Sequence, residues 1–100
     1  MRFCVTILSH NNAQNRRNTK NLKSILQQKY KNYHIVFIDD FSTDNNINIV
    51  MSYLRSVNFP QNRVQYVQNI QRNFATYNYM NAAFNFCDKD DVQVIIDGDD

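Results

Sequence analysis

The chain has 100 residues, 43% of them hydrophobic and 20% charged, and its formal net charge is +2. This length suffices for one small domain, and the composition is that of a globular protein, not a disordered or fibrous one. The longest apolar run, Ile35 to Ile38, is far shorter than the roughly 18 residues of a membrane span. No secretory signal is visible either, so the sequence predicts a cytoplasmic protein without a membrane segment.

Two features of the composition bear on partners and compartment. Cys4 and Cys87 lie near opposite ends of the chain with no CxxC motif, which predicts two buried core thiols in a reducing compartment, not a disulfide or a zinc site. Six of the eleven basic residues fall between Arg16 and Lys31. This stretch lacks the interleaved aromatic residues that stack bases, so it predicts the solvated face of a helix and no nucleic-acid partner.

Four apolar runs of strand length alternate with three stretches of helical periodicity. Continuous apolar runs are typical of strands buried on both faces, and the order β-α-β-α-β-α-β predicts an α/β fold with a parallel sheet. The expected strands are Phe3 to Leu8, His34 to Ile38, Arg63 to Val67 and Val92 to Ile96. The expected helices run from Asn18 to Tyr30, from the Ser42-Thr43-Asp44 cap through Leu54, and from Asn73 with Tyr77, Met80, Phe84 and Cys87 facing inward.

Polar clusters follow three of the expected strands: Ser9-His10-Asn11, Asp39-Asp40 and Asp97 to Asp100. The carboxyl ends of parallel strands meet at one edge of a sheet, where ligands bind. Closely spaced aspartates repel one another unless a cation is present, and oxygen-only ligands favour Mg²⁺ or Mn²⁺ together with phosphates. The residues alone therefore predict a metal site for a phosphorylated ligand. Taken singly, the Asp39-Asp40 pair is more typical of a turn or a helix cap than of a ligand site, and the acidic stretch Asp97 to Asp100 is as typical of a solvated chain end as of a metal site.

The chain contains five short motifs whose order and spacing resemble those of the amino-terminal nucleotide-binding half of the family 2 glycosyltransferases. This family has the A-type glycosyltransferase (GT-A) fold. The resemblance covers essentially the whole chain. The segments that carry it are Leu8 to Asn11, Gln28 to Tyr33, Ile38 to Asp44, Asn73 to Phe84, and the DxD motif within Ile96 to Asp100.

The resemblance implies a Rossmann-like sheet with strand order 3-2-1-4. Residues 1–100 would form the donor-binding half of a truncated domain, with the acceptor half and the catalytic base beyond Asp100. The strand Val92 to Ile96 would then be an unpaired apolar edge. We therefore expect this chain alone to self-associate and to transfer no sugar.

The implied reaction is metal-assisted, inverting transfer of a sugar from a nucleotide-sugar donor to a glycan, lipid or protein that the sequence does not identify. Asp40 would accept a hydrogen bond from the nucleobase, with Ser9, His10 and Asn11 beside the base and ribose. A carboxylate can accept the imide N–H of uracil, so a UDP-sugar is favoured over a guanosine or thymidine donor.

Asp97 and Asp99 form the DxD pair. By the resemblance, Asp97 would lie near the ribose or the metal, and Asp99 would bind the Mn²⁺ or Mg²⁺ that bridges the diphosphate.

Some positions depart from the family pattern. Phe41, Ala75 and Ala83 replace glycines, so the turn after Asp40 is expected to differ. Met80 replaces an arginine that faces the donor phosphates, for which Arg72 is the candidate substitute.

Two other readings fit parts of the sequence. One is a non-catalytic remnant that still binds a nucleotide. The other is a receiver-like, Mg²⁺-binding signalling domain, although the first strand here lacks the acidic pair that a receiver would place after it.

Overall fold

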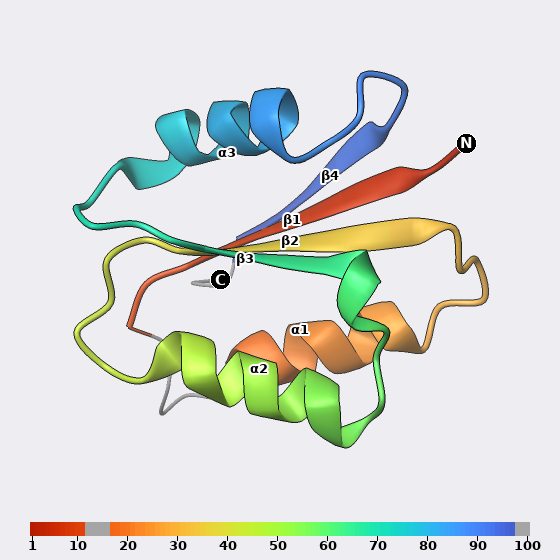
Figure 1. Cartoon of the computed structure of the whole chain (residues 1–100), viewed down its shortest axis with the longest axis horizontal. Helices are drawn as coiled ribbons and strands as arrows, with labels where there is room; N and C mark the ends of the chain where they lie inside the picture. The colour runs from red at the N-terminus through yellow and green to blue at the C-terminus, as the bar shows by residue number, and fades with distance from the viewer. Residues whose placement is uncertain (12–16, 98–100) are drawn as a thin grey trace.

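The computed structural model of the chain describes residues 1–11 and 17–97, which form a four-stranded parallel sheet with helices on both faces (Figure 1). The order β3-β2-β1-β4 confirms the expected α/β fold. It also excludes the receiver-like reading, because a receiver places β1 between β2 and β3. The strands are β1 (Phe3–Ser9), β2 (Tyr33–Asp39), β3 (Val64–Gln68) and β4 (Val92–Asp97). The helices are α1 (Arg17–Leu26), α2 (Asn46–Ser56) and α3 (Phe74–Asn85), with a 3₁₀ turn at Gln61–Arg63.

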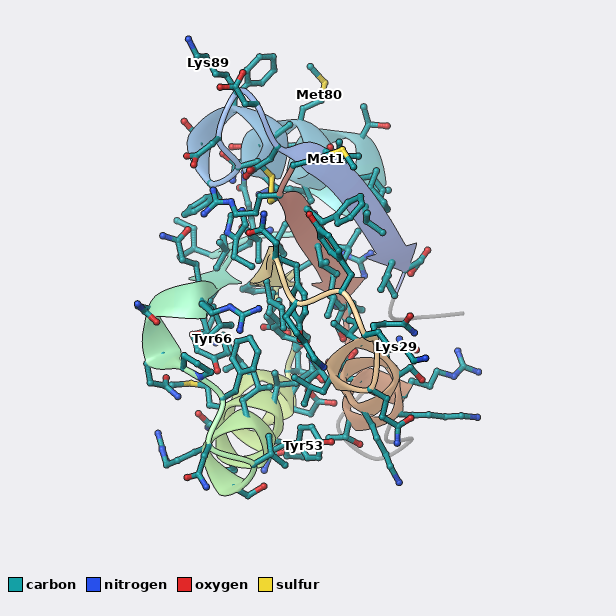
Figure 2. All side chains as sticks on the ribbon, turned by 90° about the vertical axis from the view of Figure 1, so that its right-hand side faces the viewer. Met1, Lys29, Tyr53, Tyr66, Met80 and Lys89 are labelled. Carbon is teal, nitrogen blue, oxygen red and sulfur yellow. A yellow bond between two sulfur atoms is a disulfide. The ribbon has the colours of Figure 1, made fainter. Side chains whose placement is uncertain are left out.

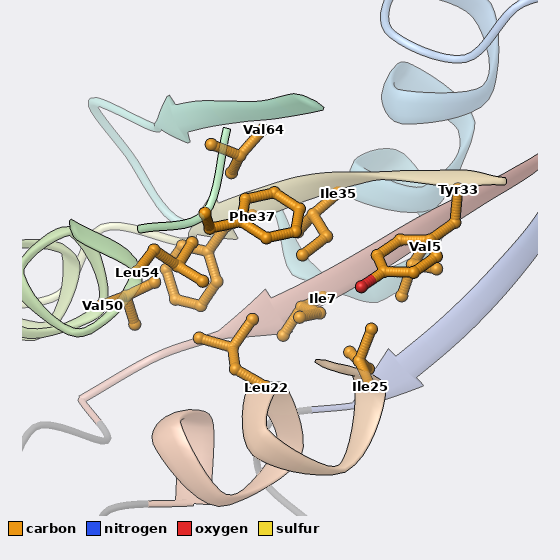
Figure 3. Close-up of a cluster of buried hydrophobic side chains, with 11 residues drawn as sticks. Val5, Ile7, Leu22, Ile25, Tyr33, Ile35, Phe37, Val50, Leu54 and Val64 are labelled. Atoms are coloured by element: carbon orange, nitrogen blue, oxygen red, sulfur yellow. The ribbon is translucent and has the colours of Figure 1, made fainter. Parts of the chain in front are cut away.

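Alternating side chains of β1 and β2 supply two cores, one on each face of the sheet. Helices α1 and α2 cover one face and α3 covers the other (Figure 1). On the first face, Leu22 and Leu54 of the helices point toward Ile7, Ile35 and Phe37 of the strands (Figure 3). The smaller core beneath α3 consists of Cys4, Leu8, Val36, Ile38 and Ala82.

Helix α1 ends at Leu26, so the expectation that it runs to Tyr30 is wrong. The Lys31 ammonium donates to the Leu26 carbonyl at 2.7 Å, which satisfies a group that the helix end leaves without a partner. Tyr30 lies beyond the helix, half-exposed, with its ring edge-on to Phe3 at a centroid distance of 5.4 Å.

Helix α3 buries a different face from the expected one. Tyr77, Met80 and Phe84 are 56%, 54% and 78% exposed, and Met80 points away from the sheet in Figure 2. The buried residues are Asn78 and Ala82. Asn78 accepts a hydrogen bond from the Asn69 amide at 2.7 Å, and the small Ala82 lets the helix approach the sheet closely. The hydrogen bond of Asn78 and the close packing at Ala82 therefore decide which face of α3 is buried, although the apolar periodicity of the sequence favours another face.

Cys4 and Cys87 form a disulfide, so the prediction of two free core thiols is wrong. The sequence separation of the two residues concealed their proximity: Cys4 lies on β1, and the end of α3 brings Cys87 back over that strand. The expectation of a reducing compartment rested on free thiols and loses that support.

None of the helices among the described residues is long and apolar enough to cross a membrane.

The turn after Asp40 keeps a conformation that glycine favours. Phe41 has a φ of 60°, in the left-handed region that costs a residue with a Cβ roughly 1–2 kcal/mol. Phe41 thus adopts the left-handed backbone conformation in spite of its Cβ, and the turn carries this strain.

We expect Phe41→Gly to raise the free energy of unfolding by up to about 1 kcal/mol, because it removes this strain while the half-exposed ring loses little packing. Phe84→Gly is the matched control: Phe84 is exposed in the last turn of α3, and the change should lower stability by about 0.5 kcal/mol. Urea denaturation followed by circular dichroism measures both. Equal losses of stability in the two variants would contradict the strain argument.

Strand β4 is an edge strand within the described part of the chain, where it pairs with β1 alone. Val92, Val94 and Ile95 are 42%, 37% and 49% exposed. An exposed apolar edge is a template for pairing with another chain.

We expect the chain to self-associate through this edge, and Ile95→Lys to bring the average mass in sedimentation experiments toward the monomer value of 11.9 kDa. Ser52→Lys adds the same charge on the exposed face of α2 and should leave the association unchanged. If Ile95→Lys associates as strongly as the unmodified chain, β4 is not the contact.

Candidate functional site

The parallel strands end on the left of the sheet in Figure 1, and polar residues lie at and just beyond these ends. The register pairs Ser9 at the end of β1 with Asp39 on β2, and Leu8 with Asp97 on β4. The expected convergence of the three polar clusters on one sheet edge therefore holds as far as Asp97. Asp99, the expected metal ligand, lies with Gly98 and Asp100 outside the described residues.

Beneath this edge lies a buried polar network. The Ser9 hydroxyl accepts hydrogen bonds from the side-chain amides of Asn18 and Asn46, both at 2.9 Å. The Asn46 amide also donates to Asp39 at 2.9 Å, and the Asn18 amide donates to the Asn46 oxygen at 2.7 Å. The side chain of Ser9 is fully buried. It does not face the surface where a base would pack, so its role here is to join β1 to α1 and α2.

Asp39 shapes the turn that follows β2. Its carboxylate accepts hydrogen bonds from the backbone N–H of Ser42, at 3.2 Å, and from the Ser42 hydroxyl. Asn11 ties the preceding loop to the same turn: its N–H donates to the Ser42 hydroxyl at 2.9 Å, and its side-chain oxygen accepts from the Thr43 N–H at 2.8 Å. For Asp39, the turn reading is therefore confirmed.

The Asp40 carboxylate joins β2 to the start of α3. It accepts hydrogen bonds from the Asn69 amide (2.9 Å), the backbone N–H groups of Asn73 (2.8 Å) and Phe74 (2.9 Å), and the Arg72 guanidinium (3.1 Å). Its side chain is only 2% exposed. Burial alone would raise the pKa of the Asp40 carboxyl, but the hydrogen bonds, led by that from Asn73, hold it below the usual value. Asp40 is therefore ionised at neutral pH.

An ionised carboxylate offers about four lone pairs, so these four donors occupy all of its acceptor positions. The Arg72 guanidinium is the more exposed of the two side-chain donors, since Asn69 is part-buried. Its side chain is 36% exposed and lies 4.6 Å from the centre of the Phe74 ring. Arg72, the candidate substitute for a phosphate contact, is thus held by Asp40 in this structure. Sequence reasoning missed the Asn69 and backbone contacts because they depend on the loop after β3.

His10 lies between the loops that follow β1 and β2. Its Nδ1 is 2.8 Å from the Asp40 carbonyl oxygen, which can only accept, so Nδ1 carries the proton. Its Nε2 accepts from the Asn11 side-chain amide at 3.1 Å. The imidazole is fixed in one orientation as a flat ring at the rim of the site.

The family model described as glycosyl transferase family 2 matches residues 4–100. No curated protein matches the sequence significantly.

Among the solved structures that match the fold, five are 19–22% identical to this chain and cover 98–100% of it. A mannosyltransferase from Pyrobaculum calidifontis, PcManGT in complex with GDP-Man and Mn²⁺, superposes with a TM-score of 0.81 over 98% of the chain and 27% of its own length, at 22% identity. Residues 1–349 of TarS from S. aureus superpose with a TM-score of 0.75 over 100% of the chain and 28% of that chain, at 22% identity. The same TarS segment in complex with UDP-GlcNAc gives 0.70 over 99% and 27%, at 20% identity.

This chain thus spans about a quarter of the length of the solved structures it matches. The family match covers almost all of its residues, and the sheet order is the one that the motifs led us to expect. The chain belongs to glycosyl transferase family 2, and its four-stranded parallel sheet is the Rossmann-like part of a GT-A fold.

Proposed function

We propose that this chain forms the donor-binding half of a metal-assisted glycosyltransferase that uses a nucleotide sugar. The observation that carries the proposal is the meeting of His10, Asn11, Asp40 and Asp97 at the carboxyl edge of the sheet in a family 2 domain. Two of the matched structures hold GDP-Man with Mn²⁺ and UDP-GlcNAc, which supports a nucleotide-sugar donor. Acceptor binding and the general base are assigned to residues outside these 100.

In the proposed complex, the base and ribose lie beside His10 and Asn11. Ser9 supports this floor from below through its contacts with α1 and α2. Asp97 lies near the ribose or the metal, and Asp99 binds Mn²⁺ or Mg²⁺. When bound, the ion neutralises the charge that builds on the departing nucleoside diphosphate.

Arg72 couples base binding to phosphate binding in this proposal. A nucleobase N–H reaches Asp40 by taking the place of the Arg72 guanidinium, the more exposed of its two side-chain donors. The Asn69 amide and the two backbone N–H groups stay in place and keep the carboxylate oriented. The released guanidinium can then pair with the diphosphate, the contact that Met80 cannot make.

Base preference follows from the chemistry of the Asp40 carboxylate. Uracil N3, thymine N3 and guanine N1 each carry a hydrogen, whereas cytosine N3 is an acceptor that would face the carboxylate without a shared proton. The proposal therefore favours a UDP-sugar, with guanosine and thymidine donors as alternatives.

We expect UDP to bind more tightly than CDP by about tenfold or more, because cytosine N3 would be a buried acceptor without a donor, which costs about 1–3 kcal/mol. Asp40→Asn should abolish the preference, since an amide can serve either base. Asp44→Asn, an exposed aspartate of the same loop, is the matched control. Titration calorimetry in the presence of Mn²⁺ measures the affinities, and equal binding of UDP and CDP by the unmodified chain would overturn the assignment of Asp40.

The metal assignment makes a separate prediction. The chain should bind Mn²⁺ weakly alone and more tightly with UDP, because phosphate oxygens complete the coordination shell. Asp99→Asn should remove this gain. Asp90→Asn, an exposed aspartate of the α3–β4 connection, should keep it. If calorimetry finds nucleotide-dependent Mn²⁺ binding unchanged in Asp99→Asn, the DxD assignment is wrong.

A nucleotide-binding protein without transferase activity is the second candidate, favoured by Met80 at the family's arginine position. Such a protein would bind UDP with Mn²⁺ but would consume no donor when the complete protein is supplied with UDP-GlcNAc or GDP-mannose.

A further inference from the structure

Four side chains that can bind a metal ion meet at the end of the sheet opposite the candidate donor site. Cys4 on β1 pairs in register with His34 on β2, Cys87 follows α3, and Asp91 directly precedes β4. The ligand atoms of Cys4, His34 and Asp91 lie within 4.8 Å of one another, and Cys87 is bonded to Cys4. Two ligands of one tetrahedral zinc ion, each about 2.0–2.3 Å from it, lie about 3.3–3.8 Å apart. The three ligand atoms would therefore move toward one another by up to about 1 Å to bind one ion.

The Asp91 carboxylate is held firmly in this cluster. It accepts hydrogen bonds from the Arg2 guanidinium at 2.9 and 3.0 Å and from the Asp88 N–H at 2.8 Å, and it lies 2.8 Å from Nε2 of His34. Its side chain is 3% exposed. The hydrogen bond from Arg2 keeps the pKa of the Asp91 carboxyl well below its usual range, so a charged oxygen ligand is already in place.

We propose that reduction of the Cys4–Cys87 disulfide converts this cluster into a zinc site with Cys4, Cys87, His34 and Asp91 as its ligands. Two sulfurs, one imidazole and one carboxylate form a tetrahedral set that suits Zn²⁺ better than the hard ions Mg²⁺ and Mn²⁺. Two thiolates and one carboxylate would offset Zn²⁺ and the neighbouring Arg2 guanidinium, which also pairs with the exposed Asp88. This site is independent of the proposed donor site.

The chemistry of the conversion is that of thiol–disulfide exchange. A dithiol reductant supplies two electrons and two protons, becomes a disulfide itself, and leaves Cys4 and Cys87 as thiols. Zn²⁺ then displaces one proton from each thiol to solvent and binds neutral His34 through a ring nitrogen. The sulfurs must separate from about 2 Å to the spacing of two ligands about 2.3 Å from one ion. Cys87 can move, because it lies part-exposed in a connection, whereas Cys4 is buried in a central strand.

The disulfide and the metal are mutually exclusive occupants of this cluster, because a disulfide sulfur is not a thiolate ligand. The cluster would therefore bind metal only under reducing conditions and would exchange one cross-link between β1 and the α3–β4 connection for another.

Co²⁺ tests the proposal, because it replaces Zn²⁺ in tetrahedral sites and gives intense visible bands together with a thiolate-to-metal charge-transfer band. The reduced chain, prepared with a phosphine in the absence of oxygen, should bind one equivalent of Co²⁺ with both signals, and Zn²⁺ should abolish them. The oxidised chain should show neither. An oxygen-only site at Asp97 and Asp99 gives no thiolate band, so it cannot imitate the result.

His34→Gln should weaken Co²⁺ binding by at least about tenfold, since it removes a direct ligand. His10→Gln, which changes the chain's other histidine at the opposite end of the sheet, should leave the thiolate band unchanged. Absence of this band in the reduced chain, its presence in the oxidised chain, or unchanged binding by His34→Gln would each overturn the proposal. If reduction unfolds the chain, circular dichroism measures whether Zn²⁺ restores its secondary structure. Refolding on addition of Zn²⁺ supports the site, and failure to refold refutes it.

Discussion

The polar residues at each end of this sheet lie together because β1 is placed between β2 and β4. Parallel pairing in this register places Ser9 beside Asp39 and Leu8 beside Asp97 at one edge, and Cys4 beside His34 near the other. A shift of β1 by one residue would send its core side chains to the opposite faces and would separate both sets of polar residues. The buried apolar residues on both faces of β1 make such a shift costly, so the core fixes the chemistry at each end.

Asp40 fixes the loops that follow the strands at the carboxyl edge of the sheet. Its carboxylate receives donors from the loop after β3 and from the first residues of α3, and its carbonyl oxygen receives His10 from the loop after β1. Asp40 thus holds three segments of the carboxyl edge together, two of them through its buried charge and one through its backbone carbonyl. Removal of the charge would leave several donors without partners, so stability and ligand binding depend on the same residue.

The sequence was sufficient for the features that depend on local pattern. Strand-length apolar runs and ordered motifs gave the element order, the sheet order and the edge at which His10, Asp40 and Asp97 meet. It was insufficient where one contact between distant segments decides the outcome. The buried face of α3 follows from the bond between Asn78 and Asn69, and the pairing of Cys4 with Cys87 follows from the return of α3 over β1. Neither contact leaves a periodic signal in the sequence.

The two proposed sites differ in the hardness of their ligands, and this difference bears on how one small domain could hold two ions. The carboxyl edge offers carboxylates and the phosphates of a donor, which suit Mg²⁺ or Mn²⁺. The opposite end offers sulfur, imidazole and one carboxylate, which suit Zn²⁺. Since His34 and Cys4 lie near the start of their strands, and Asp40 and Asp97 at or just beyond the ends of theirs, the strands separate the two ligand sets along their length. Selectivity would then follow from ligand type, and the oxidation state of Cys4 and Cys87 would govern one site without altering the ligands of the other.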